Sequence, residues 1–539
     1  MNPTACLLVR GSPLLPALLF AAFAAAQEPA VLLTEVVSPP PAAVAWDAAE
    51  RASNPMILRS AFVRVEPDVF AAVRTDGVQP LATCILEHFG TRTTIAISGY
   101  EFVLGHRVLR GRAVGAEADF VMSFASDGTA SGLLDFGGRA VGIAPTGQPG
   151  VHVVQDLDTT RLPAPSACGV DHTHAVAAPP GPGLPEGANS DCSVTTIDLL
   201  VCYTPLARTN AGGTSAMEAA IVAAVAQANT GHRESGAPIE FRLVHMHETA
   251  YVELGTSTDL SRFRSTSDGH MDEVHGLRDT YGADLMQLIT NHPSPAYCGI
   301  AYLMTSLSTG FASSAFAVTV RTCIPGHTFT HECGHNMGCH HDAANASGAI
   351  YPYSYGYRTP DNAWRSIMAY APGTRVNRWS SPNVVWQGYT MGVANAADNA
   401  RSIDDTRATV AAFRGTQVLR WCDLDGGIAG TSGLPTLEGR GTVGPTVPVE
   451  LRIRDFLSGA PGVLIVGASE INQPLVGGTL VPSPDVMLGI VGTGTEIVHN
   501  ASWLLGLGSG FQAWFQAAFL DAAAIEGFSA SDAVKVTVP

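Results

Sequence analysis

Residues 331–342, with the sequence His-Glu-Cys-Gly-His-Asn-Met-Gly-Cys-His-His-Asp, decide how the central part of this chain is interpreted. Residues four apart on a helix share one face, so His331 and His335 can direct both imidazoles at a single ion. Glu332, next to the first histidine, points close to that ion without having to bind it. It can therefore act as general base toward a water molecule. The spacing predicts a helix that carries two metal ligands and a catalytic carboxylate.

The residues after this helix complete the predicted site. Gly338 allows the chain to leave the helix in a backbone conformation that is costly for other residues. His341 can then swing back as a third ligand. Three neutral nitrogens and one water position are typical of a catalytic zinc site rather than a closed structural one. The alternative is a helix with surface histidines, because the shorter five-residue pattern also arises by chance. Gly338 and His341 at these offsets favour zinc.

A second, distant segment agrees with this interpretation. Met368, in the sequence Ser-Ile-Met-Ala-Tyr of residues 366–370, lies 27 residues after His341. Zinc endopeptidases with the extended motif place their Met-turn in such a position. Met368 alone would more often be a simple core residue. Tyr370, two residues further on, either approaches the metal or packs beneath the site with one hydroxyl partner, and the sequence leaves both open.

In these residues the chain resembles the metzincins. The motif with Asp342 directly after the third histidine is similar to the reprolysin branch, and the similarity to bacterial peptidyl-Asp metalloendopeptidases is closer. The similarity covers roughly residues 195–415, consistent with one catalytic domain. The matching segments outside the motif are 198–205, 277–284, 298–304, 355–357 and 378–382.

The resemblance implies a zinc endopeptidase of α/β (α+β) class, with an upper sheet, an active-site helix and a lower part below the cleft. It implies one catalytic Zn2+ and protein or peptide substrates. Asp342 is expected to hold the turn by hydrogen bonds rather than to take part in chemistry. Cys333 and Cys339 stand at variable positions of the motif, and their pairing stays open.

The resemblance also implies cleavage at acidic residues, which requires a basic specificity pocket. Arg375 and Arg378 follow the Met-turn closely and are candidates to line the wall beneath the primed side. The alternative is that both are solvated loop charges. Calcium is compatible with such domains, but no EF-hand-like loop or repeated Asp pattern gives it a position.

Composition and charge limit the function further. The chain has 539 residues, enough for about three domains. Its formal net charge of −17, without a Lys/Arg-rich run, argues against a nucleic-acid partner. Residues 1–26 predict a signal peptide, with Arg10 before an apolar run that ends in small residues. The alternative, a membrane anchor, is disfavoured because the run is short and contains Pro16. No later segment is long enough to span a membrane, so we expect a secreted protein.

The composition and the apolar periodicity of the sequence change along the chain and predict three folded units. Short alternating runs in residues 27–165 predict a β-rich prodomain, with strands such as Thr93–Ser98 and Phe102–Leu109. Residues 166–191 are Pro/Gly-rich and predict an activation linker. In residues 192–416 strands alternate with helices, such as Ser215–Asn229 and Ile403–Phe413, which predicts an α/β unit with a mixed sheet. Residues 417–539 predict an accessory β-sandwich.

Nine cysteines lie outside the predicted signal, and an odd number requires at least one unpaired thiol. Cys168 stands in Ala-Cys-Gly-Val-Asp, which resembles the cysteine switch of matrixin and reprolysin proenzymes. Its thiolate would be a fourth zinc ligand that displaces water. The alternative is a disulfide to Cys84. We also predict a disulfide between Cys298 and Cys323. The strand Gly299–Met304 is either an edge along which a substrate lies or an ordinary sheet strand.

These observations favour a secreted zinc endopeptidase made as a latent zymogen. The alternative from another class is a cell-surface binding protein with a degenerate protease domain. Inactive relatives commonly lose the base or a ligand, whereas Glu332 and the three histidines are all present here. The sequence makes no prediction of the oligomeric state.

Overall fold

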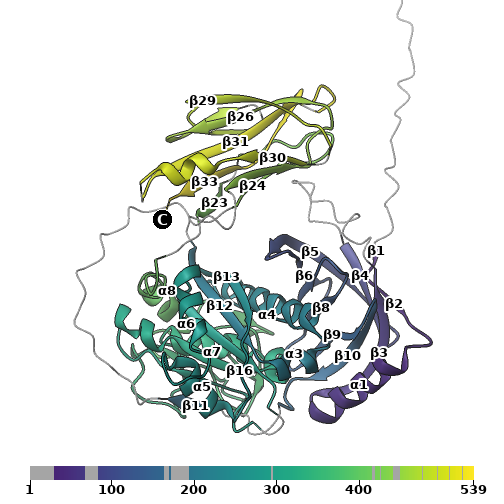
Figure 1. Ribbon diagram of the computed structural model, residues 1–539, viewed down its shortest axis with the longest axis vertical. Coiled ribbons are helices and arrows are strands. Elements are labelled where there is room, and N and C mark those ends of the chain that lie inside the picture. Colours follow the sequence, from purple (N-terminus) through teal and green to yellow (C-terminus); the bar gives the residue numbers. More distant parts are fainter. Residues whose placement is uncertain are drawn as a thin grey trace, which may run out of the picture.

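The computed structural model is shown in Figure 1. It describes residues 30–66, 83–162, 169–171, 194–292, 295–415, 419–424, 426–440, 449–475, 477–494, 496–508, 510–524 and 526–538. Elements of both types are present, so the molecule is of mixed α/β class. The predicted signal peptide, residues 1–26, and most of the predicted linker lie outside the described residues. Among the described residues, no helix combines the length and the apolar character needed to cross a bilayer.

In its described residues, the N-terminal unit is one ten-stranded sheet with a single helix. Its strand order is β1-β4-β5-β6-β7-β8-β9-β10-β3-β2, antiparallel except for the β1–β4 pair. The elements are β1 Ala30–Val31, β2 Leu33–Glu35, α1 Pro41–Ser53, β3 Ile57–Val65, β4 Thr83–His88, β5 Thr91–Val103, β6 His106–Ala113, β7 Asp119–Phe124, β8 Ala130–Asp135, β9 Arg139–Gln148 and β10 Val151–Asp158.

One local expectation for this unit is wrong, and one helix was not expected. The predicted strand Phe102–Leu109 is broken in its middle, because a turn at Leu104 and Gly105 separates β5 from β6. Both turn residues have positive φ, 45° and 83°, the backbone region that glycine adopts most easily. Helix α1, which has an Ala-rich sequence and begins directly after Pro40, was not predicted.

The central unit is built on a six-stranded sheet of order β11-β15-β16-β14-β12-β13. All neighbours are parallel except β15 and β16, so the sheet is mixed, as predicted. Its elements are β11 Gly169–Asp171, β12 Thr195–Tyr203, α3 Pro205–Ala211, α4 Thr214–Glu234, β13 Ile239–Glu248, α5 Thr256–Arg264, α6 Glu273–Tyr281, β14 Leu285–Thr290, β15 Gly299–Tyr302, η1 Thr309–Ser314, β16 Phe316–Val320, η2 Arg321–Gly326, α7 Thr328–Asn336, β17 His340–Asp342, β18 Tyr355–Gly356, β19 Trp364–Arg365, β20 Thr374–Arg375, β21 Val385–Trp386, β22 Tyr389–Thr390 and α8 Asn399–Val410.

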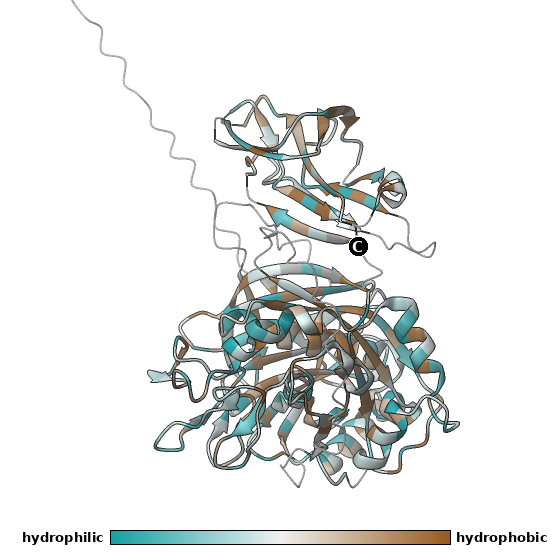
Figure 2. Cartoon of the chain, turned by 90° about the vertical axis from the view of Figure 1, so that its left-hand side faces the viewer, coloured by the Kyte–Doolittle hydropathy of each residue, from teal (hydrophilic) through white to brown (hydrophobic). Residues whose placement is uncertain are grey.

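Helices α4 and α8 differ in extent from their predictions. Helix α4 continues to Glu234, and nearly all of its residues from Ala216 to His232 are buried because it lies between two sheets. In Figure 1 it separates the central strands from the N-terminal strands. Helix α8 begins four residues earlier than Ile403, because the Asp398 side chain caps it by accepting a hydrogen bond from the Arg401 backbone N–H. Apolar residues gather in the interior of both sheets (Figure 2).

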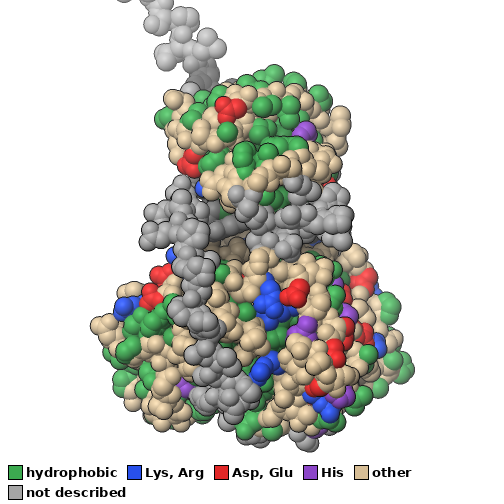
Figure 3. All heavy atoms as spheres, turned by 60° about the vertical axis from the view of Figure 1, so that its left-hand side comes forward, with side chains coloured by type: hydrophobic (Ala, Val, Ile, Leu, Met, Phe, Trp, Pro, Cys, Tyr) green, Lys and Arg blue, Asp and Glu red, His purple; other side chains and the backbone are tan. Residues whose placement is uncertain are grey.

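The C-terminal unit consists of β-strands and one short 3-10 helix. A six-stranded sheet and a three-stranded sheet share one core, which includes Leu451 and Ile453 from the smaller sheet and Phe515 and Val534 from the larger. Hydrophobic side chains also reach the surface of this unit, which is the upper part of Figure 3. Its elements are β23 Arg420–Leu424, β24 Thr436–Arg440, β25 Glu450–Arg454, β26 Pro461–Gly467, β27 Glu470–Leu475, β28 Gly478–Pro482, β29 Val486–Val491, β30 Glu496–Asn500, η3 Ser502–Gly506, β31 Gln512–Leu520, β32 Phe528–Ala530 and β33 Ala533–Thr537.

Candidate metal centre

Helix α7 carries the first two histidines of the motif, and it is buried along its whole length. It lies against β15 and β16, where the Asn336 side-chain amide donates hydrogen bonds to the carbonyl oxygens of Tyr302 at 2.8 Å and Phe316 at 3.3 Å. The Met304 backbone N–H, just after β15, donates to the His335 carbonyl at 3.1 Å. The helix is therefore fixed against the sheet at its C-terminal end. Asn336 is not one of the residues that define the motif, so only the fold reveals its role.

The imidazoles of His331, His335 and His341 converge. They are buried, and one potential ligand atom from each lies within 4.8 Å of the others. The Nε2 atoms of His335 and His341 are 3.0 Å apart. Nδ1 of His331 lies 2.8 Å from the Ile367 carbonyl oxygen, and Nδ1 of His335 lies 2.9 Å from the Cys339 carbonyl oxygen. A carbonyl only accepts, so these Nδ1 atoms carry the hydrogens and Nε2 keeps a lone pair.

This arrangement fits a metal ion. Nε2 of His331 is buried and has no hydrogen-bond partner among the described residues, as expected for a nitrogen that binds a metal ion. Burial, and then the nearby Arg375 guanidinium, hold the pKa of His331 well below its usual range, so the ring is neutral. Neutral nitrogens with their second ring nitrogen held by a backbone carbonyl are the donor set that zinc prefers.

Glu332 lies between this cluster and strand β15. Its carboxylate is fully buried and rests directly against the backbone of Gly299, the first residue of that strand. A Cβ atom added to Gly299 would lie 2.7 Å from both Cγ and Cδ of Glu332. Gly299 thus provides the space for the carboxylate next to a strand edge. No local pattern predicts this contact, because it joins residues 33 positions apart.

The turn after the helix has the geometry that the glycine was expected to allow. Gly338 has a φ of 86°, and its N–H donates to the His335 carbonyl at 3.0 Å. The Cys339 N–H donates to the Gly334 carbonyl at 2.9 Å. The chain then enters β17, which contains His341.

The Met-turn segment packs directly beneath the helix. A Cβ atom added to Gly334 would lie 2.8 Å from Sδ of Met368 and 2.9 Å from the indole of Trp379. Both side chains are completely buried. Gly334, between the two helical histidines, is therefore required for close approach. Its role was missed in the sequence because the contacting residues are more than 30 positions away.

Asp342 ties the third histidine to the Met-turn segment. Its carboxylate accepts a hydrogen bond from the Tyr370 backbone N–H at 2.9 Å and pairs with the Arg358 guanidinium at 2.8 Å. The Tyr370 ring packs on the His341 imidazole, with the ring centroids 4.0 Å apart. Tyr370 therefore lies next to the histidine cluster.

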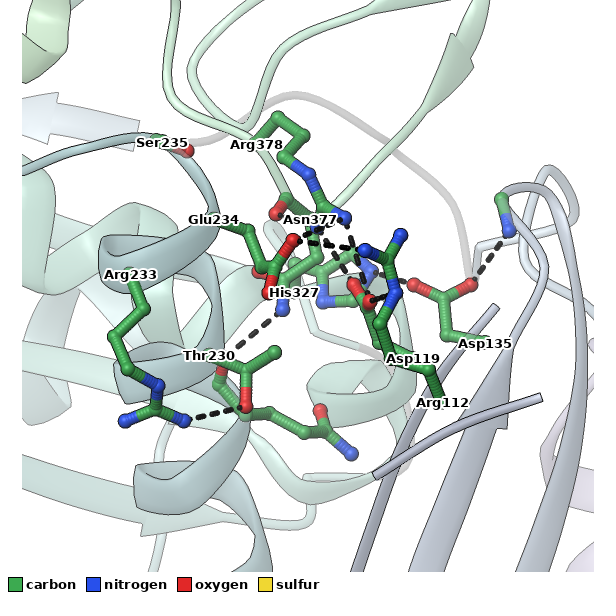
Figure 4. A network of polar contacts seen from close by, with 12 residues as sticks. Arg112, Asp119, Asp135, Thr230, Arg233, Glu234, Ser235, His327, Asn377 and Arg378 are labelled. Carbon is green, nitrogen blue, oxygen red and sulfur yellow. Dashed lines mark hydrogen bonds and ion pairs between the residues drawn. The ribbon is translucent and has the colours of Figure 1, made fainter. Parts of the chain in front are cut away.

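The two arginines proposed for specificity lie in different places. Arg375 is 7% exposed, donates to the Gly326 carbonyl at 3.1 Å, and lies close to His331. Arg378 is also buried, but it pairs with Asp119 of the N-terminal unit at 2.6 Å (Figure 4). Neither is a solvated loop charge. Arg365, which sequence reasoning overlooked, is the register neighbour of Arg375 in the β19–β20 pair and is 5% exposed.

Several cysteines are free in the structure, so their odd number does not identify one unpaired thiol. Cys298 and Cys323 form a disulfide. Cys84, Cys202, Cys333 and Cys339 are free and buried, so a Cys84–Cys168 disulfide is wrong and the count alone does not single out one thiol. Cys422 is disulfide-bonded.

Cys168 lies outside the described residues, but the three residues that follow it are described. Gly169–Asp171 form β11, which pairs in parallel with β15, with Gly169 opposite Ile300 and Asp171 opposite Tyr302. The free edge of β15 is therefore covered in the full chain.

Comparisons with known proteins agree with this geometry. The model of metallo-peptidase family M12 matches residues 193–380. The peptidyl-Asp metalloendopeptidase of Xanthomonas campestris pv. campestris is 37% identical over 295 residues, covering 54% of this chain and 68% of that protein. The protein of the same name from Stenotrophomonas maltophilia is 37% identical over 300 residues, covering 54% of this chain and 69% of that protein. The chain belongs to the M12 metallopeptidases.

As a member of the M12 metallopeptidases, the protein is a zinc metalloendopeptidase, and the family implies a catalytic zinc. The three-histidine group is the one in the described part of the chain that matches this requirement. The solved structure of metalloproteinase-II from Bacteroides fragilis is 12% identical, with a TM-score of 0.34, covering 48% of this chain and 81% of that chain. A likeness this distant supports no conclusion about the fold.

Proposed function

We propose that this metallopeptidase is a secreted endopeptidase, made as a latent zymogen, in which His331, His335 and His341 hold the zinc and Glu332 is the general base. The observation that carries the proposal is the convergence of three buried imidazoles beside a carboxylate that rests on β15. Export is proposed from the signal-like composition of residues 1–26.

Each residue of the site has a part in peptide hydrolysis. Zinc in such a site supplies Lewis acidity, which acidifies water and polarises a peptide carbonyl. Glu332 takes the proton of the attacking water and passes it to the leaving amine. Asp342 and Met368 are positioning residues, because they hold His341 and the underside of helix α7 in place. Tyr370, whose ring lies against His341, is a candidate to contact the reacting carbonyl.

The substrate is proposed to lie extended along β15, next to Glu332. This strand pairs with β16 on one side, and its other side is taken by β11 in the full chain. A substrate would have to displace β11, because main-chain hydrogen bonds on that edge are already used. This supports latency, with Cys168 as the proposed fourth zinc ligand directly before β11.

The latency proposal predicts that Cys168→Ser makes the full-length chain active or self-cleaving, since without the thiolate ligand only the pairing of β11 with β15 opposes the substrate. The readout is cleavage of a quenched peptide and the appearance of shorter chains on a gel. A Cys168→Ser chain that stays as inactive as the wild type would count against it.

A preference for acidic substrate residues is proposed from the names of the relatives and from the buried arginines near His331. Arg365 donates to the carbonyl oxygens of Gly373, at 2.8 Å, and Ala369. Burial, and then the charge of Arg375, lower its pKa well below the usual range. Among the described residues Arg365 makes no ion pair with a carboxylate. Two neighbouring buried cations are stabilised when an anionic side chain docks beside them.

Arg375→Gln in the processed enzyme tests this preference, with Arg378→Gln as the matched control. We expect Arg375→Gln to lower kcat/KM for an Asp-containing peptide by about tenfold to a hundredfold, the loss of one charged hydrogen bond. Cleavage of an Ala-containing peptide should change little. Equal effects of Arg375→Gln and Arg378→Gln on both peptides would contradict the assignment.

Adjacent histidines test the ligand set. His341→Ala should lose zinc and all peptide cleavage, because two remaining nitrogens hold the ion weakly. His340→Ala should keep both, since His340 is outside the convergent group and bonds through Nδ1 to the His341 backbone. Zinc per chain is measured by mass spectrometry of the metal. Retention of zinc by His341→Ala would refute the assignment of that ligand.

A further inference from the structure

The N-terminal sheet packs directly against the central unit. Val121 of β7 joins the core around helix α4, whereas its neighbours Phe120 and Met122 join the core of the N-terminal sheet itself. The Ser123 hydroxyl donates to the Ala219 carbonyl of α4. The Trp46 indole donates to the Asn210 carbonyl at 3.0 Å. Alternate residues of β7 therefore face two different units.

Four charged side chains, two from each unit, form a network across this boundary, and two of them are buried (Figure 4). Arg378 pairs with Asp119 at 2.6 Å and with Glu234 at 3.5 Å. Arg112 pairs with the same two acids, at 3.6 Å and 3.4 Å. The Arg378 and Asp119 side chains are only 3% and 6% exposed. A pair this buried resists separation, because removal of one partner leaves an uncompensated buried charge on the other.

Two further contacts join N-terminal acids to basic side chains of the central unit. Glu50 of α1 pairs with Arg321 of η2 at 2.6 Å, and both side chains are nearly buried. Asp135 of β8 lies 2.9 Å from Nε2 of His327, the residue before helix α7. Together with Asp119, three N-terminal carboxylates thus meet three basic groups at separate places. Such complementary charges fix the register of an interface.

The boundary also has features of a docking surface rather than of a continuous core. The face of α4 that meets the N-terminal sheet carries mainly alanines, which include Ala216, Ala220, Ala223 and Ala224. A cavity of about 90 Å³ remains between the two units, lined by these alanines and by residues of β8, β9 and β10. Small side chains bury little apolar area each, so this face of α4 tolerates exposure to water when the N-terminal unit departs.

We propose that the N-terminal unit binds the catalytic unit through this surface independently of the connecting chain. Cleavage between residues 172 and 193 then leaves a stable two-chain complex, and full exposure of the site takes a second event that removes or degrades the N-terminal unit. The partner that this surface fits is residues 30–162 of the same chain, with Asp119, Glu50 and Asp135 as its ionic contacts. This is independent of whether Cys168 binds zinc.

The test uses the full chain with a sequence-specific protease site in place of residues 180–186, in a Glu332→Ala background that prevents self-digestion. After cleavage, a non-reducing denaturing gel must show two separate chains. We expect these chains to co-elute in native size-exclusion chromatography at the position of the uncut protein. Elution as two separate folded fragments at micromolar concentration would overturn the proposal.

Single substitutions test which contacts stabilise the complex of the two cleaved chains. Asp119→Asn should raise the dissociation constant between the cleaved chains at least tenfold, because Arg378 and Arg112 lose one of the two acids that they share. Asp156→Asn is the matched control, since Asp156 also pairs with two arginines, Arg59 and Arg139, but both belong to the N-terminal sheet. Should Asp119→Asn fail to fold, as seen by circular dichroism of the uncut chain, Glu50→Gln makes the same test at Arg321. Equal dissociation constants for the control and the interface variants would show that this network does not hold the complex.

Discussion

At the scale of single residues, two glycines position the catalytic groups by having no side chain. Gly334 lets Met368 and Trp379 reach the underside of helix α7, and Gly299 makes room for the Glu332 carboxylate. Gly338 differs from both, because its need is local: it lies at positive φ in the turn. A requirement for glycine that comes from the local backbone conformation can be recognised in a motif. A requirement that comes from contacts with distant residues can be recognised only in the fold.

Gly334→Ala should destabilise the catalytic unit by about 1–3 kcal/mol, because the added methyl group overpacks the contact with Met368 and Trp379. It should also weaken zinc binding, since His331 and His335 flank this position. Thermal unfolding and zinc retention against a chelator measure the two effects.

Gly276→Ala is the matched control for this prediction. Gly276 lies in helix α6 with no atom within 4 Å of an added Cβ. Alanine there should be neutral or stabilising by about 1 kcal/mol, because glycine is the weaker helix former. A Gly334→Ala protein as stable and as zinc-bound as Gly276→Ala would contradict the packing argument.

At the scale of elements, the strands and helices with strong periodicity were predictable and their ends were not. The strand expected at Thr93–Ser98 and the helix expected at Ser215–Asn229 exist, but helix α4 extends to Glu234 because tertiary burial stabilises its last turn. Helix α8 starts at Asn399 because of its Asp398 cap. The break between β5 and β6 occurs at Leu104, a residue that sequence statistics do not place at positive φ.

Strand β10 contains a buried titratable group that makes the fold sensitive to acid. His152 is 2% exposed, and its Nε2 accepts a hydrogen bond from the Ala130 N–H at 3.0 Å. Burial lowers the pKa of His152 from 6.5 to about 4. The unfolded chain therefore binds the proton first as the pH falls below about 6.5. The contribution of neutral His152 is full above that pH and is lost as the pH falls toward 4.

His152→Gln should reduce the acid sensitivity of the fold, because the Gln oxygen can accept from Ala130 without titrating. The wild type should lose up to about 3 kcal/mol between pH 7 and pH 4 from this group, and the variant should lose that much less. Denaturant unfolding at pH 7 and at pH 4.5 measures the difference. An identical pH dependence in the two proteins would rule out His152 as its source.

At the scale of the whole molecule, the sequence does not reveal how the N-terminal and central units meet. The motif His331–Asp342 predicted the convergence of three histidines, because metal ligation demands fixed spacings on one helix and one turn. The pairing of Arg378 with Asp119 joins residues 259 positions apart, and no local pattern encodes it. The N-terminal sheet therefore contributes to the surroundings of the catalytic unit in a way that only the fold reveals.

The central claim is that three imidazoles hold the zinc while Glu332 handles the proton. Glu332→Gln in the processed enzyme separates these two roles, because the amide fits the same space against Gly299 but cannot act as a base. Zinc per chain and the rate of peptide cleavage are measured on one preparation. We expect one zinc per chain in both proteins and a rate that is lower in the variant by about 10²- to 10⁴-fold. A variant that cleaves peptides at the wild-type rate with its zinc in place would contradict the claim.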